Sequence, residues 1–316
     1  MTVERVATSA QSQNMLSQIM KANKTLDTVT AQVSTGKVST DYSGIGDKTA
    51  ALEGARAAAA RADAYATNTQ LAVTQTDLQD TQLTTLSSLA EQLKEAISTA
   101  AGNGDGSGLM TTAQDIFQQA SSILNSTDSN GNYIYGGGRG DTKPFTATSL
   151  SDLTSSGVSS FFQNGSTKKS VLVGDGQSVQ IGVLASDVGT ELMTALQNLA
   201  NADSPSGSLD NSLTDDQVST LSGTVLSSAT TAYTDLNGVT AANGDTYSRL
   251  QDVVTNQQSL STLYKGFVSD IEDADMTQAS VNLSQAQTAL QAALEVTSKL
   301  GQLSLLNYLP SSSSSG

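Results

Sequence analysis

Histidine, cysteine and tryptophan are absent from this 316-residue sequence, and aromatic residues make up only 4% of it. Without histidine the chain lacks the commonest general base and metal ligand, and without cysteine it has no thiolate nucleophile, disulfide or zinc thiolate. We therefore expect no catalytic residue, no metal site and no cofactor, and we interpret the protein as not being an enzyme. The missing cysteine leaves the redox compartment open, because a reducing cytosol and an oxidising exterior both tolerate such a chain.

Positive charge is also scarce, because 15 basic residues stand against 30 acidic ones and give a net charge of −15. Such a chain repels the phosphates of nucleic acids and the surfaces of anionic membranes. No stretch approaches the roughly 18 consecutive apolar residues of a membrane span, and the first residues show no apolar run with a small-residue cleavage site. We expect no nucleic-acid partner and no membrane insertion, and we expect any export to use a route that reads no cleaved signal peptide.

The N-terminal segment carries apolar residues at spacings that alternate between four and three. This heptad stripe predicts an amphipathic helix that packs against a partner helix, and Gly36 is a suitable terminator for it. A second helix is predicted from near Lys48 to Gly102, about 50 residues or about 75 Å at 1.5 Å per residue. A helix of that length needs a partner along its length. The first stripe consists of Met15, Ile19, Ala22, Leu26, Val29 and Val33.

The middle of the chain changes in composition after a shorter predicted helix over residues 109–124. Gly, Ser, Thr and β-branched residues become frequent, and Val171–Val173 and Val179–Ile181 flank a Gly-Asp-Gly turn. This pattern is typical of a β-hairpin. We also predict a helix near Gly189–Leu199, and we interpret residues 140–210 as a small β-containing inserted domain.

Helical periodicity resumes near Asp216, and the last segment again places apolar residues at three- and four-residue steps. The Ser-rich tail is predicted to be disordered. The predicted fold class is mainly α, a long antiparallel helical rod with coiled-coil termini and the small β-containing domain at its far end. The predicted regions are 1–45, the N-terminal coiled-coil assembly helix; 46–139, the N-terminal half of the rod; 140–210, the inserted domain; 211–268, the C-terminal half of the rod; 269–310, the C-terminal coiled-coil assembly helix; and 311–316, the tail.

Apolar stripes at both chain ends must be buried, either against each other or against neighbouring subunits. Their position at the two extremes of the chain favours assembly over a purely internal bundle. The predicted assembly interface consists of Met15, Ile19, Leu26, Val29, Val33, Leu283, Leu290, Leu294, Leu300, Leu303, Leu305, Leu306 and Leu309.

Four acidic residues lie close together in the C-terminal part: Asp270, Glu272, Asp273 and Asp275. Paired carboxylates could perform acid–base chemistry or bind a metal ion. The interpretation that we prefer is a solvated helix face, or an acidic first turn that the helix dipole favours. A hydrolase that uses Asp270 and Asp273 would need these carboxylates in a pocket.

Both chain ends resemble the bacterial flagellin superfamily. Val33-Ser34-Thr35-Gly36-Lys37 resembles the stretch that ends the first helix of flagellins, and Ile271-Glu272-Asp273-Ala274-Asp275 resembles the stretch that opens their last helix. The Gln- and Ala-rich segment from Ala286, with its Leu303-Ser304-Leu305-Leu306 ending, is similar to the flagellin C-terminus. The three stretches occur in the order of the family.

Two further stretches resemble the hook-associated protein 3 branch, whose members join hook to filament. The first is Gly131–Gly137 followed by Asp141–Phe145, and the second is the ending Ser304–Leu309. The loop after Lys37 departs from both branches, because Gly46-Asp47-Lys48 stands where they have Asp-Asp-Pro.

The resemblance implies a structural subunit of the extracellular flagellum that joins hook to filament and leaves the cell by type III export. It implies a homo-oligomeric ring or tube of this chain, with hook-associated protein 1, flagellin or the filament cap protein, and an export chaperone as partners. A filament-forming flagellin is the alternative within the superfamily. An alternative of another class is a surface adhesin that acts through residues 140–210.

Overall fold

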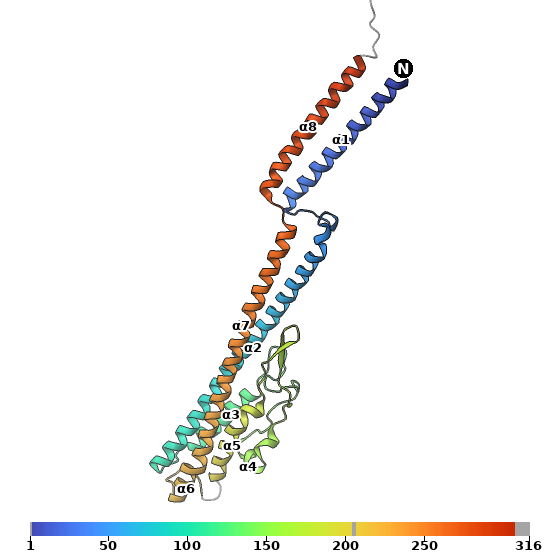
Figure 1. Ribbon diagram of the computed structural model, residues 1–316. Coiled ribbons are helices and arrows are strands. Elements are labelled where there is room, and N and C mark those ends of the chain that lie inside the picture. Colours follow the sequence, from blue (N-terminus) through green and yellow to red (C-terminus); the bar gives the residue numbers. More distant parts are fainter. Residues whose placement is uncertain (1, 204–206, 307–316) are drawn as a thin grey trace, which may run out of the picture. The chain divides into compact units, whose positions relative to one another are not determined.

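The computed structural model describes residues 2–203 and 207–306, with side chains for residues 10, 13–203 and 207–299. The chain divides into two compact units. Unit 1 comprises Met1–Arg61 and Leu260–Gly316, and unit 2 comprises Ala62–Ser259. Long helices dominate both units, and the one regular sheet among the described residues has two antiparallel strands (Figure 1). The predicted mainly α fold class with a small β element is confirmed.

Unit 1 contains the two terminal helices, α1 (Thr2–Thr35) and α8 (Met276–Leu306), which run antiparallel side by side (Figure 1). Helix α1 ends where the sequence predicted, because Gly36 adopts a φ of +71° and its N–H donates to the carbonyl of Gln32 at 2.9 Å. A residue with a side chain is strained at such a φ, which is why glycine commonly follows the last helical residue.

Two short 3-10 helices, Tyr42–Gly44 and Gly46–Lys48, connect α1 to the next long helix. The Asp41 carboxylate accepts the N–H of Gly44 at 3.1 Å and so caps the first of them. Helix α2 then runs over Thr49–Asn103, which agrees with the predicted start near Lys48. It begins in unit 1 and continues into unit 2.

The main core of unit 2 lies between α2, α3 (Leu109–Leu124) and α5 (Ala185–Asp203), with the short α4 (Leu150–Ser155) and a 3-10 helix at Val158–Phe161 closing it. Helix α3 has the predicted bounds, whereas α5 extends beyond the predicted helix at both ends. Buried members of this core include Leu83, Leu86, Leu93, Ile97, Ile116, Phe117, Leu124, Leu192, Leu196 and Leu199.

Four of the five phenylalanines of the chain gather in this core. Phe145 is fully buried, and its ring centroid lies 6.2 Å from that of Phe117 in an edge-on arrangement and 5.0 Å from that of Phe162. The ring centroid of Phe161 lies 6.4 Å from that of Phe145. These four phenylalanines therefore serve the core of unit 2, where rings bury much area for each ordered side chain.

The hairpin β1 (Ser170–Gly174) and β2 (Gln177–Gln180) packs on α2 and α7 within unit 2. Its register pairs Val171 with Val179, and a bulge follows Leu172. The Tyr65 hydroxyl donates to the Asp175 carboxylate at 2.8 Å. The predicted hairpin is confirmed. Its small core consists of Ala72, Val73, Val173, Val179, Ile181, Leu250 and Val254.

Helix α6 (Asp215–Thr220) leads through a π-helical turn, Leu221–Val225, into the long helix α7 (Leu226–Glu272). Helices α2 and α7 carry polar groups on their shared face in unit 2. The buried Asn243 amide donates to the carbonyl of Thr76 and to the Asp80 carboxylate, both at 3.1 Å.

Among the described helices, none is long and apolar enough to cross a membrane.

Candidate functional site

Within unit 1 the helix is interrupted between α7 and α8, and the short connector between them lies beside the end of α1. The N–H of Val38 donates to the carbonyl of Glu272 at 2.7 Å, and the N–H of Ala274 donates to the carbonyl of Gly36 at 2.8 Å. Lys37 and Asp273 thereby form an isolated antiparallel bridge. The segment after α1 and the connector between α7 and α8 are thus joined by backbone hydrogen bonds, although they are more than two hundred residues apart in the sequence.

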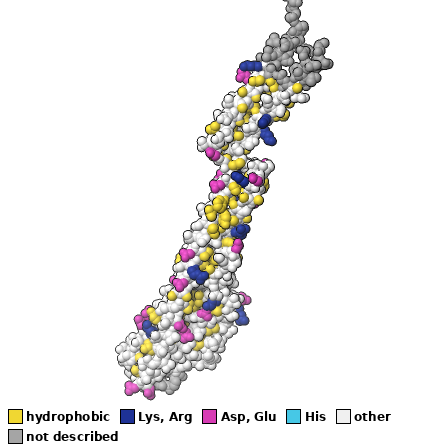
Figure 2. All heavy atoms as spheres, viewed as in Figure 1, with side chains coloured by type: hydrophobic (Ala, Val, Ile, Leu, Met, Phe, Trp, Pro, Cys, Tyr) yellow, Lys and Arg dark blue, Asp and Glu magenta, His cyan; other side chains and the backbone are white. Residues whose placement is uncertain are grey.

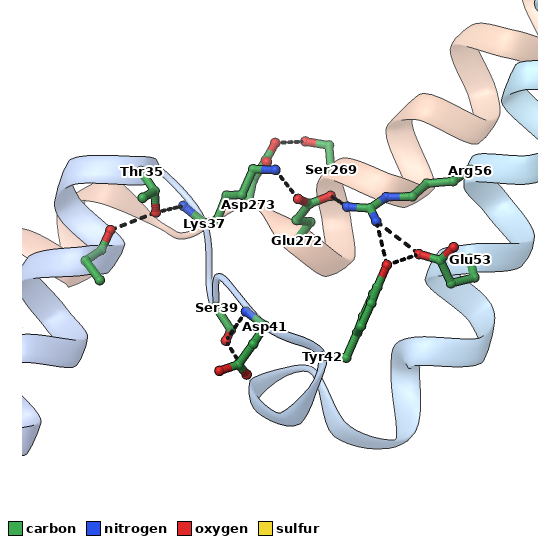
Figure 3. Close-up of polar contacts among 11 residues, drawn as sticks. Thr35, Lys37, Ser39, Asp41, Tyr42, Glu53, Arg56, Ser269, Glu272 and Asp273 are labelled. Carbon is green, nitrogen blue, oxygen red and sulfur yellow. Dashed lines mark hydrogen bonds and ion pairs between the residues drawn. The ribbon is translucent and has the colours of Figure 1, made fainter.

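An ion cluster holds this bridge, and we call Lys37, Arg56 and Glu272 the ionic latch (Figure 3). One oxygen of the Glu272 carboxylate accepts from the Lys37 ammonium, and the other accepts from Arg56 Nη2 at 2.6 Å. The Glu272 side chain is only 8% exposed, whereas those of Lys37 and Arg56 are 45% and 37% exposed. The carboxylate is thus buried, and the two cations that neutralise it keep contact with water.

Further contacts orient the Arg56 guanidinium from its other side. Its Nη1 donates to the Glu53 carboxylate at 3.0 Å and lies 3.4 Å from the Tyr42 hydroxyl (Figure 3). The same hydroxyl donates to Glu53 at 2.8 Å. Because a guanidinium has five donors in a fixed plane, it can bind Glu272 and Glu53 together, which a lysine could not do with the same geometry.

The contacts of the latch favour the charged forms of Glu272 and Arg56. The bond from Lys37, and after it the bond from Arg56, hold the pKa of the Glu272 carboxyl below its ordinary value, although burial opposes this. The bond to Glu272 raises the pKa of Arg56 in turn. A buried carboxylate costs free energy unless it is paired and hydrogen-bonded, and here both of its oxygens are paired with a cation.

The predicted role of the acidic cluster is wrong for Glu272, which is buried in an ion cluster and does not lie on a solvated face. Its partners are 235 and 216 residues away in the sequence, so no local pattern could reveal them. Asp270, Asp273 and Asp275 are exposed, as that interpretation expected.

The stretch Ile271–Asp275 also differs from the prediction that it opens the last helix. Ile271 and Glu272 end α7, and α8 begins only at Met276. Asp275 is the N-cap, because its carboxylate accepts the N–H groups of Thr277 at 2.9 Å and Gln278 at 3.1 Å.

The predicted interface residues of α1 lie on the side of the helix that contacts α8. Val29 is buried, and the other four are half-buried. On α8, Leu283 and Leu290 are half-buried, but Leu294 is 52% exposed. The side chains of Leu300, Leu303, Leu305 and Leu306, and the whole of Leu309, lie outside the described residues. The four half-buried α1 residues are Met15, Ile19, Leu26 and Val33.

A second set of apolar side chains lies on the outer faces of the α1–α8 pair. Leu16 and Met20 of α1 are 58% and 57% exposed, and Val281 and Val296 of α8 are 47% and 51% exposed. Together with Leu294 they form what we call the outer apolar set. The heptad stripes do not include the other four members, because one stripe assigns each helix a single apolar face, whereas the spacing of Leu16 and Met20 defines another.

The last turns of α7 in unit 1 also present hydrophobic side chains to solvent, and Figure 2 shows hydrophobic atoms gathered there. Leu263 and Phe267 are 51% and 48% exposed, and the Phe267 ring lies 6.4 Å from that of the half-buried Tyr264. Scattered exposed apolar residues are normal, but contiguous ones are typical of interaction surfaces.

Comparison with known proteins agrees with the motifs of the two ends. Residues 226–309 match the bacterial flagellin C-terminal helical region, a range that includes α7 and the latch residue Glu272. No curated protein sequence matches the chain. The resemblance to the flagellin superfamily is thus confirmed over this region.

Solved structures share the fold. A structure named as a flagellar hook-associated protein from Vibrio parahaemolyticus superposes with a TM-score of 0.57 at 16% sequence identity, covering 74% of this chain and 99% of that one. FlgL from Bacillus cereus superposes with a TM-score of 0.52 at 14% identity, covering 69% of this chain and 98% of that one. At these identities the likeness establishes the fold.

Proposed function

We propose, from the flagellin C-terminal region and the fold shared with hook-associated proteins, that this chain is a structural subunit of the bacterial flagellum that assembles through α1 and α8. The observation that carries the proposal is the outer apolar set. These side chains lie on helices that already pack against each other, so a contact within the α1–α8 pair does not cover them. A neighbouring subunit would.

Energetics support a contact between subunits. Fully burying one leucine, valine or methionine side chain stabilises by about 1.5–3 kcal/mol, so the outer apolar set offers several kcal/mol that the isolated chain leaves unused. Most of the stability of a helix in a protein comes from the packing of its apolar face. Copies of this chain that bury these residues against each other would gain stability and order together. The predicted interface residues that are buried or half-buried between α1 and α8 would then hold the pair, and the outer apolar set would join the copies.

The position at the hook–filament junction is the finer part of the proposal. The segments Gly131–Gly137 and Asp141–Phe145 and the ending Ser304–Leu309, which resemble hook-associated protein 3, support it. In that position the chain would form a homo-oligomeric ring or tube outside the cell after type III export with a chaperone. It would contact hook-associated protein 1 on one side and flagellin or the filament cap protein on the other, and it would perform no catalysis.

Substitution of the outer apolar set tests the assembly proposal. In the variant Leu16→Ser, Met20→Ser we expect retained helicity by circular dichroism but loss of incorporation into flagella, measured in a strain that lacks the native copy. The control is Leu71→Ser, at a leucine of α2 in unit 2 that is 68% exposed, and this variant should incorporate normally. Normal incorporation of the double variant would overturn the proposal.

A deletion strain separates the junction role from that of a filament flagellin. Loss of a junction protein should leave hooks in place while full-length flagellin is shed into the medium as monomers. Loss of flagellin itself should leave hooks and no shed filament protein. Electron microscopy of the cells and analysis of the medium distinguish the two outcomes.

A further inference from the structure

Five asparagines of this chain are followed directly by glycine, at positions 103, 130, 164, 237 and 243. We propose that Asn130 is a site of spontaneous covalent modification, at which the main-chain nitrogen of Gly131 attacks the side-chain amide and converts the asparagine to aspartate and isoaspartate. Glycine permits this reaction because it has no side chain to obstruct the attacking nitrogen. The fold decides which of the five pairs can react.

The reaction needs only water. The Gly131 nitrogen forms a bond to the Asn130 Cγ, the bond from Cγ to Nδ2 breaks, and ammonia leaves with the proton of the former Gly131 N–H. Water then opens the cyclic imide. Attack at Cγ restores the main chain and gives aspartate, whereas attack at the main-chain carbonyl carbon gives isoaspartate. The net change is an amide and water to a carboxylic acid and ammonia, with no oxidation or reduction.

Asn237 and Asn243 are protected because both lie inside α7. In a helix the following N–H donates to a carbonyl one turn earlier, and the backbone angles keep that nitrogen away from the side-chain amide. Their side chains are held as well. Asn237 Oδ1 accepts the Ser87 hydroxyl at 2.7 Å, and the Asn243 amide, which is buried, donates to α2.

Asn164 lies outside the helices, but its amide is fixed from both ends. Its Nδ2 donates to the Ser186 hydroxyl at 3.1 Å, and its Oδ1 accepts the N–H of Ser186 at 3.2 Å. The attacking N–H of Gly165 donates to the Gly136 carbonyl at 2.9 Å. A Cβ on Gly165 would approach the Gly138 nitrogen to 3.1 Å, so the segment has little room to rearrange.

Asn103 is exposed, yet the chain after it is tied to another segment. It is the last residue of α2, and the N–H of Leu213 donates to the Gly104 carbonyl at 2.8 Å. Two residues later the N–H of Gly106 donates to the Asn211 carbonyl at 3.0 Å. Bringing the Gly104 nitrogen to the Asn103 amide requires the end of α2 to unwind and these contacts to break.

Asn130 lies in an exposed turn of residues 128–132, outside any helix. No described residue forms a hydrogen bond with its side chain, which is also true of Asn103. Unlike the segment after Asn103, however, this turn forms no hydrogen bond with another part of the described chain. Among the described residues, the hydrogen bonds of this turn are all internal to it: the Asp128 carboxylate accepts the N–H of Asn130 at 2.9 Å and that of Asn132 at 3.0 Å, and the Gly131 N–H donates to the Asp128 carbonyl at 3.0 Å. Opening it disturbs no core contact, so the reactive geometry is reached at low cost.

Conversion would change this turn in two ways. It adds a negative charge beside Asp128. The isoaspartate form also lengthens the main chain by one methylene group, which is incompatible with the bond from the Asp128 N–H to the Asn132 carbonyl at 2.8 Å. The bridge between Thr127 and Tyr133 that follows this bond should loosen.

Mass spectrometry of the full folded chain tests the proposal. After incubation in mildly alkaline buffer, peptide mapping should show conversion at Asn130 at least about tenfold faster than at Asn237 and Asn243, which equals roughly 1.4 kcal/mol of opening free energy. It should also exceed conversion at Asn103 and Asn164. Isoaspartate should appear with aspartate at Asn130, because both arise from the same imide.

Two variants sharpen the test. Asn130→Gln should abolish the fast conversion and leave the other four sites unchanged. Asp128→Ala, which removes both side-chain bonds of the turn, should accelerate conversion at Asn130 several-fold without altering the circular dichroism spectrum. Equal rates at all five sites, or a faster reaction at Asn103 than at Asn130, would overturn the proposal, since the fold would then not control the reaction.

Discussion

At the scale of single residues, Glu272 connects three segments of unit 1. It is buried, it binds one cation from the end of α1 and another from α2, and its own carbonyl accepts the N–H of Val38. Lys37 and Arg56 remain partly solvated. The contribution of the latch to stability should therefore lie between that of a buried ion pair, which is costly to break, and that of an exposed pair, which is small.

Replacement of Glu272 by glutamine should therefore destabilise the bridge between the connectors. The expected loss is about 1–2 kcal/mol, because the amide keeps the shape but not the charge that the two cations face. Hydrogen exchange of the Val38 and Ala274 amides should accelerate by about 5–30-fold.

The control for this prediction is Glu295→Gln. Glu295 pairs with Lys299 in an exposed pair on α8, whose side chains are 67% and 69% exposed. Exposed pairs of this kind contribute at most about 0.5 kcal/mol. Equal effects of the two substitutions on the Val38 amide would refute a special role for the latch.

The latch should also open in acid, and the sign follows from the lowered pKa of Glu272. A carboxyl whose pKa is lower in the folded state contributes stability above its unfolded value of about 4.3 and loses it as the pH falls through the folded value. The pKa of Arg56 is raised by its bond to Glu272, so its guanidinium stays charged over this range. Protection of the Val38 amide should be constant near neutral pH and fall in acid, whereas the Glu272→Gln variant should lack this fall.

Local sequence patterns indicate the neighbours of a residue in the chain but not its neighbours in space. The position of Gly36 at the end of a helix is predictable, because the backbone requirement is local. The burial of Glu272 is not predictable in this way, because its partners come from the other end of the chain. Leu16 and Met20 were missed for a third reason: their exposure depends on where α8 lies, which a heptad pattern does not specify.

At the scale of elements, the break between α7 and α8 is the feature that local rules predict least well. The segment between Ile271 and Asp275 contains neither glycine nor proline, so nothing in it forbids a continuous helix. The structure shows what ends α7: the connector pairs with Gly36–Val38, and Asp275 caps the new helix. By contrast, α3 has the predicted bounds because glycines precede it and its apolar stripe is uninterrupted.

The N-cap of α8 gives a prediction at this scale. Asp275→Ala leaves the N–H groups of Thr277 and Gln278 without their carboxylate partner, so the first turn of α8 should lose about 1 kcal/mol. Hydrogen exchange at these two amides should accelerate. Asp270→Ala, on an exposed face of α7, is the control, and a comparable effect there would argue against capping as the cause.

At the scale of the whole molecule, charge is divided unequally between the two units. Unit 2 carries 20 acidic and 6 basic residues, whereas unit 1 carries 10 and 9. Two copies of unit 2 should therefore repel each other, and two copies of unit 1 should not. Unit 1 also contains the outer apolar set, so the surface that we propose for assembly belongs to the nearly neutral unit.

This division predicts the effect of salt on self-association. Raising the salt concentration shortens the Debye length from about 10 Å at 0.1 M to about 3 Å at 1 M, so it should weaken the repulsion between acidic units while leaving apolar contacts intact. Sedimentation velocity should show stronger association at higher salt. Weaker association would instead indicate that ion pairs hold the copies together.

The positions of the two units along the chain determine the order in which they can fold. Unit 2 is one continuous segment, whereas unit 1 is made from the two ends of the chain. The latch joins Lys37 to Glu272, which are 235 residues apart, and closure of such a long loop carries a large entropic penalty that only the finished contact offsets. Unit 2 can therefore fold while the chain is still emerging from a ribosome or an export channel. Helix α1 can pack only after the C-terminal segment Leu260–Gly316, which contains its partner α8, has emerged.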